Sequence, residues 1–463
     1  MISAPRRPTS SPGLSSRHAP PLDLPFRFFL ITIAVFTLLM LLSPWETVLL
    51  LGSFTNPVLV TFVHLQTVGV IAATIFGASY QLLPVILQAP LASVRLARLS
   101  WWLIFPGLFA FLSGLLTDWL PLLAIGGILL TASFWLYAGI TLTTVIRAPH
   151  HDVITWHIAL ATLGLIGATT LGLVLVLTLA AGTPDSHFFA ILAAHILLML
   201  GGWVTPLLTG VAYRLIGMFT LAEDAFVEPL AWAELTLTAI GSWLLTCCVL
   251  FTLPSPLMIL AALMLFSGLI LFTLQILHLY RHRRRRTLDI HQPFAVTAAT
   301  CILIAVLLLL IGIVRHATID SPLWPTAGWL AIAGWAETAI QGFLYKIGPF
   351  LTWLHRYAPL AGRQRVPRLE QLFSRRIAIA GWFFWSFGIL TETIALLMNA
   401  SLLAHLAALT LSLGLLAFLS NAVQVGAHWR GRHPFPLPST PGAPPNSPPE
   451  RPTSLPRPRV PRP

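Results

Sequence analysis

GVIAATIFGASYQLLP at residues 69–84, GWVTPLLTGVAYRLIG at 202–217 and GWAETAIQGFLYKIGP at 334–349 are three copies of one pattern. Each copy begins with Gly, has a second Gly eight residues later and a Tyr three residues beyond it, and then continues with a polar and an aliphatic residue. The first glycines are 133 and 132 residues apart (202 − 69 and 334 − 202). Self-similarity at a fixed period reports how a fold is built. Because this period is far longer than a solenoid repeat, the pattern predicts a helical bundle made of three similar units.

The composition places the chain in a membrane. Of its 463 residues, 56% are hydrophobic and 9% are charged, which excludes a soluble globular protein and indicates an integral membrane protein in a lipid bilayer. A net charge of +12 would suggest a nucleic-acid partner for a soluble protein. Here the arginines gather in loops and tails, so we expect no nucleic-acid partner and assign the charge to membrane orientation. The three cysteines have no disulfide, zinc or c-type heme spacing and are interpreted as packing residues.

Twelve apolar stretches are long enough to cross ~30 Å of hydrocarbon, so we predict an all-α integral membrane fold of twelve helices. They span residues 25–43, 57–88, 99–117, 120–146, 153–181, 188–219, 229–252, 256–280, 293–315, 324–353, 374–398 and 400–425.

The predicted domain organisation combines the twelve helices with the three copies. A membrane domain at 25–432 divides into four-helix units at about 25–150, 151–290 and 291–432, and the patterned helix is the second of each unit. The Pro-rich segments 1–24 and 433–463 are predicted to be disordered cytoplasmic tails.

The orientation follows from the arginines in the connections, which apart from Arg315 fall in alternate connections. By the positive-inside rule these connections and both termini are cytoplasmic. We therefore expect a multi-pass protein of the inner (plasma) membrane of a prokaryote. The arginines on this side are Arg6, Arg7, Arg17, Arg95, Arg98, Arg147, Arg281, Arg283 to Arg286, the group from Arg356 to Arg376, Arg430 and Arg432.

The repeated pattern has an interpretation in terms of packing alone. Glycines eight residues apart lie on nearly one helix face and allow close helix approach. The polar residues that follow Tyr80, Tyr213 and Tyr345 lie near the cytoplasmic helix ends, where snorkelling to the interface accounts for them. These polar residues are Gln81, Arg214 and Lys346.

Three histidines are the candidate cofactor ligands. His64, His195 and His405 each lie one to two turns into a helix that runs inward, so all three have a similar depth in the outer third of the bilayer. Neutral imidazole is a common ligand of heme iron and copper. The alternative for each is a hydrogen bond to a neighbouring helix. The remaining histidines, including His157 and His278, are predicted to lie at the membrane interfaces or in the tails.

Three acidic residues fall within predicted spans: Glu234, Glu337 and Glu392. Ionisable groups inside a membrane are functional candidates. Glu337 and Gln341 are four residues apart and share one helix face, so with Glu392 they form a candidate proton or polar path. Carboxyl groups neutralised by burial and hydrogen-bonded across helices would give the same pattern.

The twelve-helix, three-unit plan resembles subunit I of the heme-copper oxidases, the superfamily that includes cytochrome c oxidase subunit I and the nitric oxide reductase large subunit. Gly77-Ala-Ser-Tyr80-Gln-Leu-Leu-Pro84 looks like the G-x-x-Y-Y-L-x-P end of helix 2 in the reductase branch. The resemblance implies that His64 is the low-spin heme ligand and that His195 corresponds to the first ligand of the non-heme metal. It implies a b-type heme as cofactor, ahead of copper or iron, and respiratory-chain subunits or cytochromes as partners.

The chain departs from the family at two positions. The family has a His-x-His pair on helix 10, where this chain reads TAGWL at 326–330, and a His-His pair on helix 7, where it reads PLAWAELTLTAIGSWLLT from Pro229. A binuclear oxygen- or nitric-oxide-reducing centre therefore cannot be assembled on the family plan, and classical turnover is not expected. One heme or one metal remains, held by His64 with His195 or by His64 with His405.

Three functions are compatible with the sequence. The first is a diverged oxidase-like protein that binds heme for electron transfer or gas sensing. The second is a membrane transporter or channel, based on the repeats and the buried polar groups. The third is a cofactor-free structural or assembly subunit of a respiratory complex.

Overall fold

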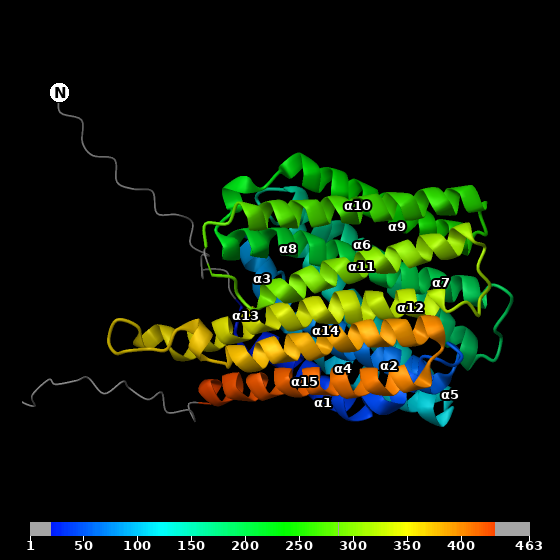
Figure 1. Cartoon of the computed structure of the whole chain (residues 1–463), viewed down its shortest axis with the longest axis horizontal. Helices are drawn as coiled ribbons and strands as arrows, with labels where there is room; N and C mark the ends of the chain where they lie inside the picture. The colour runs from blue at the N-terminus through cyan, green and yellow to red at the C-terminus, as the bar shows by residue number, and fades with distance from the viewer. Residues whose placement is uncertain (1–19, 286, 431–463) are drawn as a thin grey trace, which may run out of the picture.

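The computed structural model describes residues 20–285 and 287–430. This part of the chain is helical, with one isolated β-bridge between Ala361 and Gln364 and no strand. Twelve membrane-length helices lie side by side along one axis (Figure 1). Short 3-10 turns occupy the loops at Glu223–Ala225, Ala358–Leu360 and Leu369–Gln371.

Nine of these twelve helices are continuous α-helices. They are α1 (Asp23–Leu49), α4 (Val94–Thr117), α5 (Leu120–Ile146), α6 (Val153–Ala180), α9 (Glu228–Leu250), α10 (Ser255–Arg281), α11 (His291–Val314), α14 (Arg375–Met398) and α15 (Ser401–Trp429).

The other three are composite helices, each interrupted by a π-helical segment. They are α2 (Pro57–His64), η2 (Leu65–Ala72) and α3 (Ala73–Ile86); α7 (Phe188–Leu197), η3 (Leu198–Val204) and α8 (Thr205–Thr220); and α12 (Leu323–Trp329), η5 (Leu330–Glu337) and α13 (Thr338–Arg356).

The three composite helices are the ones that carry the repeated pattern. The π-helical segments η2, η3 and η5 begin 133 and 132 residues apart (198 − 65 and 330 − 198), and each contains the first Gly of its copy. Segment η5 packs against both η2 and η3, so the π-helical segments meet inside the bundle. Such segments are rare and occur frequently at functional sites.

The glycines of the pattern let each composite helix approach the helix before it. A Cβ on Gly77 would lie 2.9 Å from Cβ of Phe28 on α1, one on Gly210 would lie 2.4 Å from Cβ of His157 on α6, and one on Gly342 would lie 2.6 Å from Cβ of Phe294 on α11. Real Cβ contacts are not this short. The packing interpretation of these glycines is confirmed.

Each composite helix is followed by an antiparallel hairpin: α4–α5, α9–α10 and α14–α15. Small residues bring the backbones together here as well, since a Cβ on Gly126 would lie 2.3 Å from the amide nitrogen of Phe111, and one on Gly241 would lie 2.7 Å from that of Leu265. Helix α15 packs against α1 and closes the bundle.

The polytopic membrane class agrees with the helix lengths and composition. Eleven of the described helices are long and apolar enough to cross a bilayer. The composite helix at Leu323–Arg356 is equally long but does not belong to this group, and it carries Glu337 and Lys346 inside its span. Twelve traverses are an even number, so the first and last described helices open and close at the same end of the bundle. In Figure 1, α15 ends at the same side as the loop between α13 and α14.

The predicted helix boundaries agree with the structure to within a few residues, with two larger errors, one at the start of α4, which begins five residues before the predicted residue 99, and one at the end of α1. The first span was expected to end at residue 43, before Pro44, whereas α1 continues through Pro44 to Leu49. The predicted tails lie outside the described residues, except that α1 begins at Asp23, within the segment assigned to the first tail.

Candidate functional site

His64 and His195 occupy matching places on two composite helices. Each imidazole lies seven residues from the start of its helix (64 − 57 and 195 − 188), which corresponds to about 10 Å of helix length. The helix starts are neighbours, since the rings of Phe54 and Phe189 lie 6.2 Å apart. The two imidazoles also lie close enough to interact electrostatically. The structure therefore places these two sequence-predicted residues at corresponding positions of two helices whose starts are neighbours.

Both imidazoles are oriented by a backbone carbonyl. Nδ1 of His64 lies 2.8 Å from the carbonyl oxygen of Val60, and Nδ1 of His195 lies 2.7 Å from that of Ala168 on α6. A carbonyl oxygen only accepts hydrogen bonds, so each Nδ1 carries the hydrogen, and Nε2 of the neutral ring has a lone pair. Metal-ligating histidines are commonly held in this way.

Packing restrains the same two rings. The ring of His64 lies 4.7 Å from that of Phe111 on α4, centroid to centroid. The ring of His195 faces Gly172 on α6, where a Cβ would approach Cε1 to 2.9 Å. Gly172 therefore provides the space that His195 occupies.

His405 lies apart from this pair. It is the fifth residue of α15, and its side chain is exposed on the outside of the bundle. Its position gives no support to a ligand role. In the third copy, Trp329 stands directly before η5 as His64 stands before η2, and it donates a hydrogen bond to the carbonyl oxygen of Ile389 at 3.4 Å.

Two of the predicted acidic residues are buried without partners. Glu337 is the last residue of η5 and Glu392 lies on α14; neither has any exposed surface, and no carboxyl oxygen of either has a hydrogen-bond partner among the described residues. Glu46 on α1 is also buried and interacts electrostatically with both. The amide nitrogen of Gln341, one turn beyond Glu337, likewise lacks a partner within the described ranges. These four side chains form a polar group inside an apolar bundle.

The third predicted acidic residue has a complete set of partners. Oε2 of Glu234 lies 2.7 Å from Nε2 of His157 on α6 and accepts a hydrogen bond from the Tyr213 hydroxyl at 3.2 Å. The hydroxyl of Thr238 lies 3.3 Å from Oε1. His157 and Glu234 have no exposed surface. This cluster of His157, Tyr213 and Glu234 is called the buried triad below.

Sequence reasoning missed two of these residues. Glu46 was not considered because the first span was ended before Pro44, although α1 continues for five residues beyond it (49 − 44). His157 was predicted to lie at the interface near a helix end, and the sequence did not predict that its side chain is fully buried inside the protein. Its position along the helix could have indicated burial. His157 is the fifth residue of α6, so it lies more than one turn from the start of the helix.

The polar residues after the repeated tyrosines differ in their surroundings. Arg214 is exposed, as snorkelling predicts. The other two have more specific surroundings than snorkelling requires. Lys346 is mostly buried, with its ammonium 2.5 Å from a carboxyl oxygen of Asp289, and Gln81 is buried with its amide oxygen unpartnered among the described residues. Arg285 also pairs with Asp289, at 3.1 Å.

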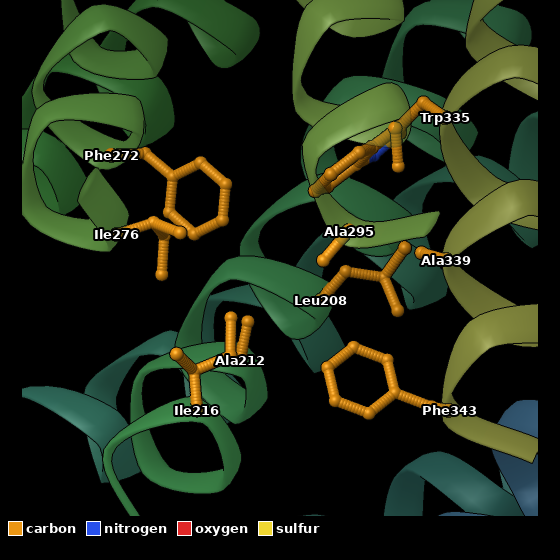
Figure 2. Close-up of a pocket in the computed structure, with 10 residues that line it drawn as sticks. Leu208, Ala212, Ile216, Phe272, Ile276, Ala295, Trp335, Ala339 and Phe343 are labelled. Atoms are coloured by element: carbon orange, nitrogen blue, oxygen red, sulfur yellow. The ribbon is translucent and has the colours of Figure 1, made fainter. Parts of the chain in front are cut away.

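A small cavity lies between α8, α10, α11 and the composite helix that contains η5 (Figure 2). Its volume of about 20 Å³ is enough for one water molecule. In Figure 2 Phe272 and Ile276 face it from one side, with Trp335 and Phe343 across from them. The lining is apolar, so this cavity contributes no ligand site.

The arrangement of donors limits what the histidines can hold. Within residues 20–285 and 287–430 no group of three or more His, Cys, Asp or Glu side chains is arranged to hold a metal ion. Protein-held metals usually take at least three such ligands, whereas a heme iron takes one or two axial side chains. Each of the two imidazoles has an Nε2 atom for which the described residues supply no hydrogen-bond partner, so the donor type, though not a shared cavity, fits the second requirement.

Neither a scan against models of protein families nor a search of curated proteins finds a match for this chain. Its function must therefore be inferred from its own residues.

Proposed function

We propose that this chain is a diverged membrane protein of the heme-copper oxidase subunit I type that binds one b-type heme for electron transfer or gas sensing. The observation that supports the proposal is the matched pair His64 and His195. Each lies on a π-interrupted helix and donates Nδ1–H to a backbone carbonyl, which leaves Nε2 as a lone-pair donor.

The chain's own residues would orient and shield the cofactor. The carbonyls of Val60 and Ala168 hold the two tautomers, while Phe111 and Gly172 restrain the ring planes. The heme, when bound, supplies one-electron chemistry. His64 and His195 would hold the heme through Nε2, and with both imidazoles bound the chemistry that it would supply is electron transfer, whereas a gas would compete with one imidazole.

The proposal includes three four-helix units and cytoplasmic termini. The three units are supported by the equal spacing of η2, η3 and η5 and by the hairpin that follows each composite helix. The orientation is supported by arginines at the end of the bundle where α1 begins. A prokaryotic plasma membrane is the location consistent with this plan.

The test is an optical spectrum of the protein purified gently from cells with ample heme. We expect a Soret band in the wild type and its loss or a clear shift in His64→Ala and His195→Ala. His405→Ala is the matched control, since it removes an exposed helical histidine at the same end of the bundle, and should leave the spectrum unchanged. A heme-free wild type would contradict the proposal. If the heme-free protein copurified with cytochromes, an assembly role would replace it.

A proton-coupled transporter is the second candidate, supported by the carboxyl groups of Glu337 and Glu392, which have no hydrogen-bond partner among the described residues, and by the buried Glu46 close to them. Intramembrane carboxyls of this kind mark proton relays and ion pathways. Proteoliposomes loaded with a pH-sensitive dye would test it. Proton flux that is present in the wild type and in Glu370→Gln, a loop variant, but absent in Glu337→Gln would favour transport over heme binding.

A further inference from the structure

The buried triad differs from the equivalent positions in the first copy of the pattern. The side chain nearest to the second glycine of each copy is Phe28 in the first, His157 in the second and Phe294 in the third. A phenyl ring is therefore sufficient for this packing position in two of three cases. The imidazole in the second case is not required by the fold.

The partner of the repeated tyrosine differs in the same way. The hydroxyl of Tyr80 forms a 2.9 Å hydrogen bond with Ser100, the seventh residue of α4, whereas that of Tyr213 donates to Glu234, the seventh residue of α9. A serine hydroxyl therefore satisfies the tyrosine in the first case. The hydrogen bond of the tyrosine hydroxyl therefore does not require a carboxyl group such as that of Glu234.

The hydrogen-bond geometry fixes the number of protons in the triad. Nδ1 of His157 lies 2.7 Å from the carbonyl oxygen of Val153, an obligate acceptor, so Nδ1 carries a hydrogen. The 2.7 Å contact between Nε2 and Oε2 of Glu234 then requires one more hydrogen between them, because without it two lone pairs would face each other. An imidazolium with a carboxylate and a neutral imidazole with a carboxylic acid each contain this one proton.

We propose that His157, Glu234 and Tyr213 form a binding site for one exchangeable proton, separate from the histidine pair and independent of any heme. The proton is held between Nε2 and Oε2, and no bond other than N–H or O–H forms or breaks. When the proton is released, it passes to water at the end of the bundle where α6 begins. His157 is the fifth residue of that helix. Tyr213 remains a donor to Oε2 and stabilises the carboxylate left behind.

The surroundings of the triad contain no competing charge among the described contacts. Helix α8 contributes Tyr213, α9 contributes Thr238, and α10 contributes the ring of Phe272, 5.5 Å from that of Tyr213. The ring of Phe226 covers the other side at 5.5 Å. Among these contacts, the shared proton is therefore the one positive charge that neutralises the carboxylate of Glu234.

Infrared difference spectroscopy with exchange into D₂O would test the proposal on the purified full-length protein, with ¹⁵N resonances of histidine read in parallel. Glu234→Gln keeps the size and hydrogen-bonding capacity of the side chain but cannot share the proton. Glu228→Gln, an exposed position on the same helix, is the matched control. We expect either a protonated-carboxyl stretch that shifts in D₂O and is lost in Glu234→Gln, or a doubly protonated His157; Glu228→Gln changes neither.

A double variant controls for the possibility that Glu234→Gln loses the signal because it misfolds. His157→Phe with Glu234→Ser gives the second copy the residues that stand in the first copy, so it should fold and bind no proton. A neutral His157 together with no Glu234-dependent carboxyl signal at any pH at which the protein is folded would overturn the proposal. Retention of the signal in the double variant would overturn it as well.

Discussion

Glu234 and Glu337 are both fully buried in helices of one bundle, yet their surroundings differ. Glu234 has an imidazole, a phenol and a hydroxyl within hydrogen-bond distance of its carboxyl oxygens. Glu337 has no such partner among the described residues and interacts electrostatically with a second carboxyl, that of Glu46. A buried carboxyl is tolerated when it is paired or when it remains neutral. Glu234 is paired, whereas Glu337 must remain neutral.

The difference teaches that burial alone does not reveal a role. The triad around Glu234 can keep its hydrogen bonds with the shared proton on either partner. The carboxyl oxygens of Glu337 and Glu392, which lack partners among the described residues, gain favourable contacts when protons, water or a cation reach them. Three experiments, ordered by expected effect, would break or sharpen this contrast.

The largest effect is expected for Glu234→Ala. It leaves the buried His157 without its partner, and breaking a buried pair by removing one member costs about 3–5 kcal/mol. The free energy of unfolding, measured by denaturant titration in mixed micelles, should fall by that amount. The double variant His157→Phe with Glu234→Ser should recover most of the loss. A non-recovering double variant would mean that the pair is needed for folding.

An effect of opposite sign is expected for Glu337→Met. The thioether fills a similar volume without an unpartnered polar group, whose burial costs about 1–3 kcal/mol. Thermal denaturation in detergent should therefore show a more stable protein. Marked destabilisation would contradict the view that Glu337 lacks partners and would point to a bound cation or ordered water.

The smallest effect is expected for the tyrosines. Tyr213→Phe removes one hydrogen bond to Glu234 and should cost about 1 kcal/mol, while Tyr345→Phe removes a longer contact of 3.4 Å with Asn421 and should cost less. The same denaturant titration compares the two variants directly. Equal losses in the free energy of unfolding would show that the hydrogen bond from Tyr213 to Glu234 contributes no more than the one between Asn421 and Tyr345.

Much of the fold was predictable from local sequence. Apolar stretches of membrane length set the helices, and the glycine spacing identified helices that pack closely against a neighbour, as Gly77, Gly210 and Gly342 confirm. The error at Pro44 arose because proline usually ends a helix, whereas α1 continues to Leu49 with Glu46 buried in its last turn. The π-helical segments were not predicted, because they depend on packing between η2, η3 and η5.

The sequence by itself determined that this protein is a helical membrane protein and that His64 and His195 lie at matching depths, because hydrophobic length and position along a helix are local properties. Only the tertiary structure decided which polar groups meet. His157 and Glu234 are 77 residues apart in the chain, and no periodicity links them. His405 shares the predicted depth but faces outward. The rotation of each helix about its axis depends on contacts with its neighbours, and that rotation decides whether a side chain reaches a partner or the lipid.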